Sequence, residues 1–170
     1  MQRWLFGREL EALAGREVFD LDECGGEHRL HQEYGRAPRG GRLYAEVAGS
    51  RRHRTRIISV SQNAKLVAPF VFEGSCNTEV VDTYFEKVLL PALPKGSVIV
   101  LDNARFHQSP STQKLVAAAG CELLFIPTYS PDRNPIEHLW ATLKAALRRI
   151  LPAANDPALS ISDMCKYYSS

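Results

Sequence analysis

The sequence predicts a single α/β domain with a mixed five-stranded sheet flanked by helices. The chain has 170 residues, of which 45% are hydrophobic, enough for one domain with a hydrophobic core. Runs of alternating or continuous apolar residues, which are typical of strands, are followed by runs with helical periodicity. Three strands come first, and then helix, strand, helix, strand and helix. This order favours a mixed sheet with helices packed on it.

Local patterns predict each element in turn. The five predicted strands cover residues 17–21, 54–61, 66–72, 97–101 and 122–126. Gln62 to Lys65 predict a hairpin between the second and third strands, and Gly25-Gly26 and residues 35–41 predict loops. The predicted helices cover residues 77–90, with Asn77 as the N-cap, 110–119, ended by Gly120, and 135–151. Residues 1–15 are also predicted to be helical.

Three acidic residues stand at the ends of predicted core elements. Asp22 ends the first strand, Asp102 follows the apolar run Val98 to Leu101, and Glu137 opens the last predicted helix. Carboxylate oxygens are hard ligands that suit Mg²⁺, with Mn²⁺ as a substitute. Two such ions about 3.5–4 Å apart clamp the attacking and leaving oxygens in phosphoryl transfer. These residues therefore predict a catalytic site with two divalent ions.

Each acid also has a plainer interpretation. Asp20 lies on the same strand face as Asp22 and competes for the first position, whereas Glu23 points to the other face. Asp102 could open a turn, although a carboxylate at the end of a buried strand is costly without a partner or ion. Asn134, Pro135 and Glu137 also match a capping box, in which the Glu only satisfies backbone donors.

Two residues after Asp102 are candidates to orient it. Asn103 could hold a carboxylate or a water, and His107 could contact phosphate or bond an acid. A loop histidine without a role is an equal alternative for His107. Trp140 shares helical spacing with Ile136 and Leu143, which predicts a core position.

Basic residues are clustered although the net charge is only +2. Arg51, Arg52, Arg54 and Arg56 crowd together, and Lys144 and Arg148 lie on the last predicted helix. Such clusters fit phosphate contacts. A solvated hairpin and cations at a helix C-terminus are the alternatives. Because the same chain carries three candidate catalytic acids, we interpret these basic clusters as contacts to DNA.

Composition places the chain in the cytoplasm. No apolar run approaches the roughly 18 residues of a membrane span, and the start lacks the pattern of a signal peptide. Cys24, Cys76, Cys121 and Cys165 form no Cys-x-x-Cys pair, which predicts free thiols. A zinc site from Cys24, His28 and His31 has poor spacing.

Two longer motifs resemble a known family. They are Asp102-Asn103-Ala104-x-x-His107 and Ser130-Pro131-Asp132-x-Asn134-Pro135-Ile136-Glu137-x-x-Trp140. Together they resemble the mariner-type transposases, and above all their bacterial insertion-sequence relatives. Those proteins belong to the DDE endonuclease superfamily, which shares its fold with ribonuclease H and retroviral integrases. The thirty-four residues between Asp102 and Glu137 match the family spacing, and Asp22-Glu23 and residues 34–40 resemble its first acidic segment.

The resemblance implies a ribonuclease H-like fold, in which the first and fourth strands lie side by side. It also implies cleavage of double-stranded DNA, transfer of the freed 3′-hydroxyl to target DNA at TA sites, and a homodimer holding the two element ends. On this basis we interpret residues 1–15 as a linker remnant, 16–152 as the catalytic domain and 153–170 as a C-terminal tail.

Full-length relatives also carry an N-terminal helix-turn-helix region. We expect it to be missing here, because only residues 1–16 precede the first predicted strand. A separate helix-turn-helix protein is then a candidate partner. Two other functions stay open: a catalytically silent DNA-binding remnant of a decayed element, and a nuclease of the ribonuclease H type.

Overall fold

The computed structural model describes residues 2–26, 55–127, 134–150 and 157–170, and contains one mixed sheet of five strands. The strand order is β3-β2-β1-β4-β5, with β1 at the centre. β1 pairs with β2 in antiparallel and with β4 in parallel orientation. The strands are β1 (Val18–Gly26), β2 (Thr55–Gln62), β3 (Lys65–Glu73), β4 (Val98–Leu101) and β5 (Glu122–Phe125). The predicted mixed sheet, with the first and fourth strands adjacent, is confirmed.

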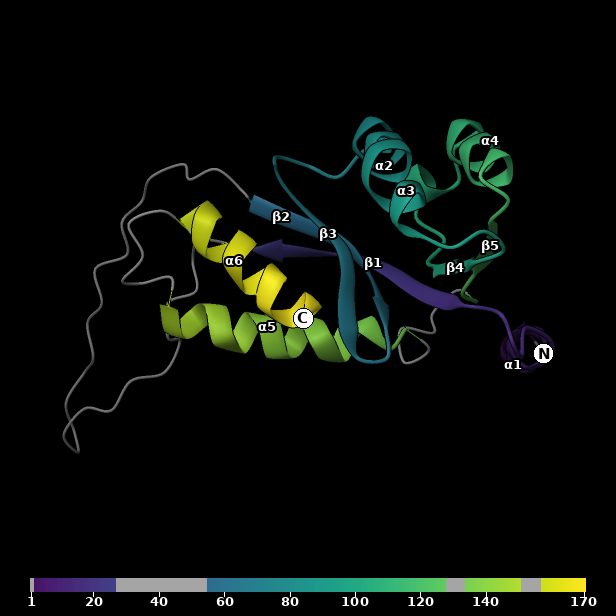
Figure 1. Ribbon diagram of the computed structural model, residues 1–170, viewed down its shortest axis with the longest axis horizontal. Coiled ribbons are helices and arrows are strands. Elements are labelled where there is room, and N and C mark those ends of the chain that lie inside the picture. Colours follow the sequence, from purple (N-terminus) through teal and green to yellow (C-terminus); the bar gives the residue numbers. More distant parts are fainter. Residues whose placement is uncertain (1, 27–54, 128–133, 151–156) are drawn as a thin grey trace, which may run out of the picture.

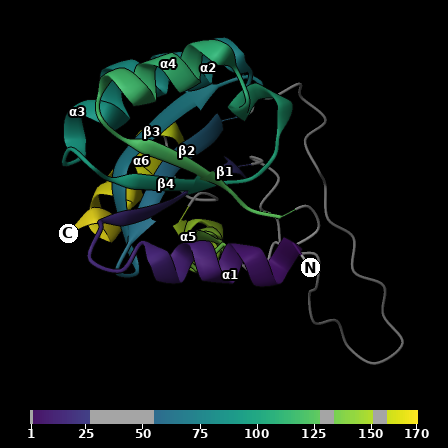
Figure 2. The same cartoon turned by 90° about the vertical axis from the view of Figure 1, so that its right-hand side faces the viewer.

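Helices cover both faces of this sheet (Figure 1). α2, α3 and α4 lie on one face and α5 and α6 on the other, and Figure 2 shows α1 on the same side as α5. The helical elements are α1 (Gln2–Ala12), α2 (Thr78–Tyr84), the π-helix η1 (Phe85–Leu89), α3 (Leu90–Ala92), the 3-10 helix η2 (Arg105–His107), α4 (Pro110–Ala118), α5 (Ile136–Ile150) and α6 (Pro157–Ser169). No helix among these described residues is long and apolar enough to cross a bilayer.

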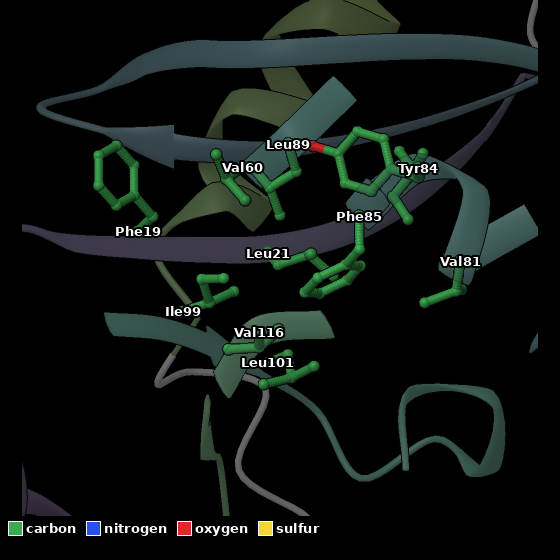
Figure 3. Packing of buried hydrophobic residues seen from close by; sticks show 11 residues of the cluster. Phe19, Leu21, Val60, Val81, Tyr84, Phe85, Leu89, Ile99, Leu101 and Val116 are labelled. Carbon is green, nitrogen blue, oxygen red and sulfur yellow. The ribbon is translucent and has the colours of Figure 1, made fainter. Parts of the chain in front are cut away.

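Alternate residues of β1 serve two separate cores. Phe19 and Leu21 pack with residues of α2, η1 and β4 (Figure 3). This cluster fills the space between the sheet and the helices on that face. Cys24, on the opposite face, packs with Trp140 of α5 and Ile161 of α6. Because successive strand side chains point to opposite faces, Asp22 lies on the α5 side and Glu23 on the α2 side.

β1 is longer than predicted. The sequence predicts that the first strand ends at Asp22-Glu23 and that Gly25-Gly26 lie in a loop, but β1 continues to Gly26. The reason is the antiparallel ladder with β2, which runs from Asp20↔Ser61 to Gly26↔Thr55. Pairing with β4 stops earlier, at Asp20↔Val100. Asp22 and Glu23 therefore sit within a strand, just beyond the last residue that β4 covers.

The C-terminal residues form part of the core. Residues 153–170 are predicted as a tail, whereas α6 occupies Pro157–Ser169. Its Ile161 and Cys165 are each 1% exposed and pack against β1 and α5 residues. At the other end, Phe6 of α1 is buried against Val100 and Ile126. Both terminal helices thus contribute packing, while the predicted domain boundaries stay predictions.

The prediction of free cysteines is confirmed. All four cysteines are free thiols, and Cys24 and Cys165 are buried. His28 and His31 lie outside the described residues, so the candidate zinc site stays untested.

The predicted hairpin between β2 and β3 is confirmed, and its turn is strained at one residue. Asn63 and Ala64 both have positive φ, 50° and 59°, as in a type I′ turn. An alanine in this region costs about 1–2 kcal/mol, whereas glycine adopts it freely. We expect Ala64→Gly to raise the free energy of unfolding by about 0.5–1 kcal/mol, since greater freedom of the unfolded chain offsets part of the gain.

Urea unfolding measures this effect. Ala141→Gly is the matched control, because Ala141 is exposed within α5 and glycine in a helix interior costs about 1 kcal/mol. If Ala64→Gly and Ala141→Gly lower the free energy of unfolding equally, the assignment of strain to Ala64 is wrong.

Candidate active site

Asp102 follows β4 directly and is held by two donors. Its Oδ1 accepts a hydrogen bond of 2.9 Å from the Ala104 backbone N–H and lies 2.7 Å from Nδ1 of His107. The His107 hydrogen bond lowers the pKa of Asp102, and burial opposes it less strongly. The Asp102 side chain remains 55% exposed. Asp102 is therefore an oriented, accessible carboxylate that is stable in its ionised form.

Asp22 lies on the neighbouring strand and is anchored from α5. Nε1 of Trp140 donates a hydrogen bond of 3.1 Å to its Oδ2. Burial, together with smaller contributions from the charges of Glu137, Glu23 and Asp102, raises the pKa of Asp22 to about 7. The Glu23 backbone N–H acts in the opposite direction. The charges of the two other predicted ligands, Asp102 and Glu137, therefore both act on the Asp22 carboxyl group.

Glu137 reaches this region because α5 begins beside β1. Nδ2 of Asn134 donates a hydrogen bond of 3.2 Å to the Leu21 carbonyl, one residue before Asp22. Oδ1 of Asn134 is buried and accepts no hydrogen bond within the described parts of the chain. The capping-box interpretation requires that oxygen to accept from the first turn of α5. Asn134 instead fixes α5 to β1, and Glu137 is exposed in that first turn.

Asp22 and Asp20 differ in their surroundings. Burial raises the pKa of Asp20 to about 6, and no acid among the described residues contributes to that shift. Asp22 interacts with Glu137 and Asp102. The assignment of the first ligand to Asp22 stays a prediction, and these interactions favour it.

The two predicted neighbours of Asp102 have different roles. His107 is 0% exposed and contacts Asp102, so a loop histidine without a partner is excluded. Asn103 donates from Nδ2 to the Ile126 carbonyl, which links the ends of β4 and β5. Gln108 in turn donates to the Asn103 carbonyl at 3.0 Å. Asn103 therefore shapes the loop after Asp102, and none of its described hydrogen bonds reaches a carboxylate.

The acids are close enough to interact but are not gathered into a finished centre. Among residues 2–26, 55–127, 134–150 and 157–170, no three His, Cys, Asp or Glu side chains form a group that could hold a metal ion as they stand. Ligation by all three would require side-chain adjustment. Asp102 is already held by two hydrogen bonds, whereas Glu137 is exposed at the start of α5, where its side chain can change rotamer readily.

Comparison with known proteins identifies the family. The model of the DDE superfamily endonuclease family matches residues 17–160. The chain belongs to this family. The match includes all three candidate acids of this DDE superfamily endonuclease.

Solved structures confirm the ribonuclease H-like fold. The catalytic domain of Mos1 mariner transposase superposes with a TM-score of 0.66 at 15% identity, covering 98% of this chain and 76% of that chain. The Mos1 transposase paired-end complex with left transposon end gives a TM-score of 0.67 at 15% identity, covering 97% of this chain and 57% of that chain. At such identity, the likeness concerns the fold.

One curated relative comes from Sinorhizobium fredii (strain NBRC 101917 / NGR234). This protein, "Uncharacterized protein y4pE/y4sA", is 29% identical over 85 residues, which cover 49% of this chain and 56% of that relative. The chain therefore spans little more than half the length of this relative and of Mos1 transposase in the paired-end complex.

The basic residues of this DDE superfamily endonuclease do not form one described surface. Arg51, Arg52 and Arg54 lie outside the described residues. Arg56 is half-buried on β2, paired with Gly25, and therefore shares a sheet face with Glu23. Its charge lowers the pKa of Glu23, although burial raises that pKa more. Arg56 thus lies beside the acidic region.

The α5 cations point in different directions. Burial raises the pKa of the Cys24 thiol to about 11, and the charge of half-buried Lys144 acts in the opposite direction. Arg148 is exposed near the end of α5. α5 is also not the last helix, since α6 packs beside it. DNA contact by Arg51, Arg52, Arg54, Arg56, Lys144 and Arg148 stays a prediction.

Sequence reasoning missed three contacts that hold the acids in place. Trp140 is a core residue, as predicted, but it also hydrogen-bonds Asp22. Asn134 bonds the β1 backbone, and Glu23 faces His107. The signal for Trp140 was present: it lies three residues after Glu137, so both project from neighbouring parts of one helix. The other two contacts depend on how the elements pack.

Trp140→Phe tests the contact with Asp22. A smaller aromatic ring remains in the core, and the N–H that stabilises the ionised carboxylate is lost. We expect the pKa of Asp22 to rise above its value of about 7, and the free energy of unfolding at pH 8 to fall by about 1–3 kcal/mol. Carbon-13 NMR titration of the Asp22 carboxyl and urea unfolding measure the two effects.

The matched control is Trp4→Phe, because Trp4 is 66% exposed on α1. That variant should leave both the Asp22 pKa and stability nearly unchanged. An Asp22 pKa that is identical in wild type and Trp140→Phe would show that the indole does not stabilise the carboxylate.

Proposed function

We propose that this chain is the catalytic domain of a transposase that cleaves DNA strands with divalent metal ions and joins the freed 3′-hydroxyl to target DNA. The observation that carries this proposal is the placement of Asp22 within β1, Asp102 directly after β4 and Glu137 in the first turn of α5, on elements that adjoin β1, where the charges of Asp102 and Glu137 act on Asp22. Membership of the DDE superfamily endonucleases supports it. The folds of the Mos1 transposase structures agree with it.

The residues fit a hard divalent cation in donor type and charge. All three offer carboxylate oxygens, as Mg²⁺ and Mn²⁺ require. The raised pKa of Asp22 reflects burial together with the negative charges around it, which a bound cation would offset. Asp22, Asp102 and Glu137 would hold the metal, with two ions per site. Bound Mg²⁺ would stabilise the charge that develops on the phosphodiester during attack and departure.

The chain itself positions these oxygens. Trp140 fixes one oxygen of Asp22, and the Ala104 N–H and His107 fix one oxygen of Asp102. Asn134 hydrogen-bonds the β1 backbone at Leu21 and so fixes the position of the start of α5, which carries Glu137. Preorganised ligands of this kind lower the cost of assembling a metal site.

The partners that we propose are double-stranded DNA at element ends and TA target sites, a second copy of the chain, and a separate helix-turn-helix protein. One Mos1 structure is described as a paired-end complex with the left transposon end, which supports DNA as the substrate class. The cytoplasm, in contact with the nucleoid, is the proposed location.

A silent DNA-binding remnant is the second candidate. The observation that favours it is that the described residues contain no finished group of metal ligands. A single experiment separates the two functions.

The experiment is supercoiled-plasmid nicking with Mg²⁺ or Mn²⁺, compared among wild type, Asp102→Asn and Glu137→Gln. Both substitutions keep the side-chain shape and remove one charged ligand. We expect a loss of more than about 100-fold in each, because loss of a ligand should exceed the 10–100-fold cost of losing its supporting residues. Asp163→Asn on α6 is the control and should cleave like wild type, since Asp163 pairs with Lys166 away from the site.

Two results would contradict the proposal. No metal-dependent nicking by wild type, with DNA binding retained in all variants, would indicate the silent remnant. Cleavage restricted to RNA–DNA hybrids would indicate a nuclease of the ribonuclease H type.

A further inference from the structure

A buried polar contact lies on the β1 face opposite Asp22. Oε2 of Glu23 and Nε2 of His107 are 3.5 Å apart, and the two side chains are 18% and 0% exposed. Both atoms are buried, and neither has a hydrogen-bond partner within the described residues. An unsatisfied buried carboxylate oxygen costs several kcal/mol. Because unsatisfied buried polar atoms are rare, two that face each other indicate a contact that is retained for function.

The other nitrogen of the same ring holds Asp102. Nδ1 of His107 lies 2.7 Å from Oδ1 of Asp102. Because an ionised carboxylate only accepts hydrogen bonds, Nδ1 carries the hydrogen. The Ala104 N–H occupies the same oxygen at 2.9 Å. Oδ1 is thus held twice, and Oδ2 is the atom of Asp102 left for another ligand.

The imidazole is fixed in this bridging position. Phe106 packs edge-on against the ring, with centroids 4.6 Å apart. The side chain has no exposed surface, so turning the ring would require repacking of its neighbours. His107 therefore connects the strand β1, through Glu23, to the loop that carries Asp102.

We propose that Glu23 and His107 are positioning residues: one proton between Oε2 of Glu23 and Nε2 of His107 lets Glu23 hold the ring, and Nδ1–H of His107 holds Oδ1 of Asp102, which leaves Oδ2 to bind a metal ion. This inference rests on the proposed function. In this arrangement both residues act through Asp102. The arrangement follows a general rule for metal sites, where outer hydrogen bonds orient the ligands.

The test measures Mn²⁺ affinity by electron paramagnetic resonance, with the metal alone and no DNA. We expect His107→Ala and Glu23→Ala each to weaken binding about 10-fold or more. His107→Asn should weaken binding about as much as Glu23→Ala, because its amide N–H replaces Nδ1–H but no atom replaces Nε2. Glu23→Gln should retain binding, since its amide can still hydrogen-bond Nε2.

The double variant is the decisive comparison. In the His107→Asn background, Glu23→Ala should change Mn²⁺ affinity by less than about 2-fold, because its route to Asp102 is already absent. Additive losses would overturn the proposed route through His107. A second readout, in metal-free protein, is the proton NMR signal of the His107 Nδ1–H. Its exchange with water should accelerate in Glu23→Ala while backbone amide exchange in β1 and β4 stays unchanged.

The outcomes also separate this inference from the proposed function. If Asp102→Asn weakens Mn²⁺ binding but Glu23→Ala and His107→Ala do not, the metal site stands and the positioning role is wrong. If Asp102→Asn has no effect on Mn²⁺ binding either, the proposed metal site is wrong, and the positioning role inferred from it is wrong too.

Discussion

Asp22→Asn is expected to stabilise the metal-free protein at pH 8 by about 2 kcal/mol or more, although it removes a proposed ligand. Burial, with smaller contributions from the charges of Glu137, Glu23 and Asp102, raises the pKa of Asp22 to about 7. At about 1.4 kcal/mol per pH unit, the difference from the ordinary value of 3.8 sets an upper bound on the order of 4 kcal/mol. Sites built for ligands commonly reduce stability in this way.

The pH range of this effect follows from the direction of the shift. The folded protein binds the Asp22 proton more tightly than the unfolded chain does. The stability that this provides is therefore complete below pH 3.8 and is lost as pH rises to about 7. Asparagine cannot ionise, so the gain in Asp22→Asn should be small near pH 4.5 and should level off above pH 7.

Urea unfolding in EDTA between pH 4.5 and 8.5 measures the gain, and Asp20→Asn is the matched control. Burial alone raises the pKa of Asp20, to about 6, so its substitution should also stabilise at high pH. Only the Asp22→Asn gain should shrink when Glu137→Gln is also present, because only Asp22 feels the Glu137 charge. A gain in stability that does not depend on pH would contradict a raised pKa of Asp22. Coupling of Glu137→Gln to Asp20→Asn, and not to Asp22→Asn, would indicate Asp20 as the ligand.

Ile161→Ala is expected to lower the free energy of unfolding by about 2–5 kcal/mol. Ile161 is 1% exposed and packs between β1 and α5 residues, including Cys24 and Trp140. Shortening it removes buried apolar contacts and leaves a cavity under the helix that carries Glu137. The size of this loss distinguishes a core helix from a tail.

Chemical unfolding again provides the measurement, with Leu159→Ala as the control on the same helix. Leu159 is 63% exposed, so its truncation should cost about 0.5 kcal/mol or less. Equal, small effects of both substitutions would mean that α6 does not belong to the folded core in solution.

Elements with strong local signals were predicted closely. Asn77 caps α2 through a 2.9 Å hydrogen bond from the Val80 N–H, as predicted, and Gly120 follows α4 with a φ of 71°. The hairpin at Asn63-Ala64 forms where the sequence placed it. Caps, turns and apolar runs act within a few residues, so the chain displays them directly.

Elements that depend on distant partners were predicted poorly. Gly25 and Gly26 have the composition of a loop, yet β2 holds both in β1. The α6 sequence has a weak amphipathic pattern, and its burial depends on the surface that β3 and α5 provide. In both cases tertiary packing outweighs local preference.

The same division applies to the site. The spacing and surroundings of Asp22, Asp102 and Glu137, and the family they indicate, were available from the sequence, because strand ends and helix starts are local features. The Trp140 contact with Asp22, the Asn134 contact with Leu21 and the Glu23–His107 contact were decided by the tertiary structure alone. Each of these joins residues more than eighty positions apart, and only the packing of α5 and η2 against β1 determines which side chains meet.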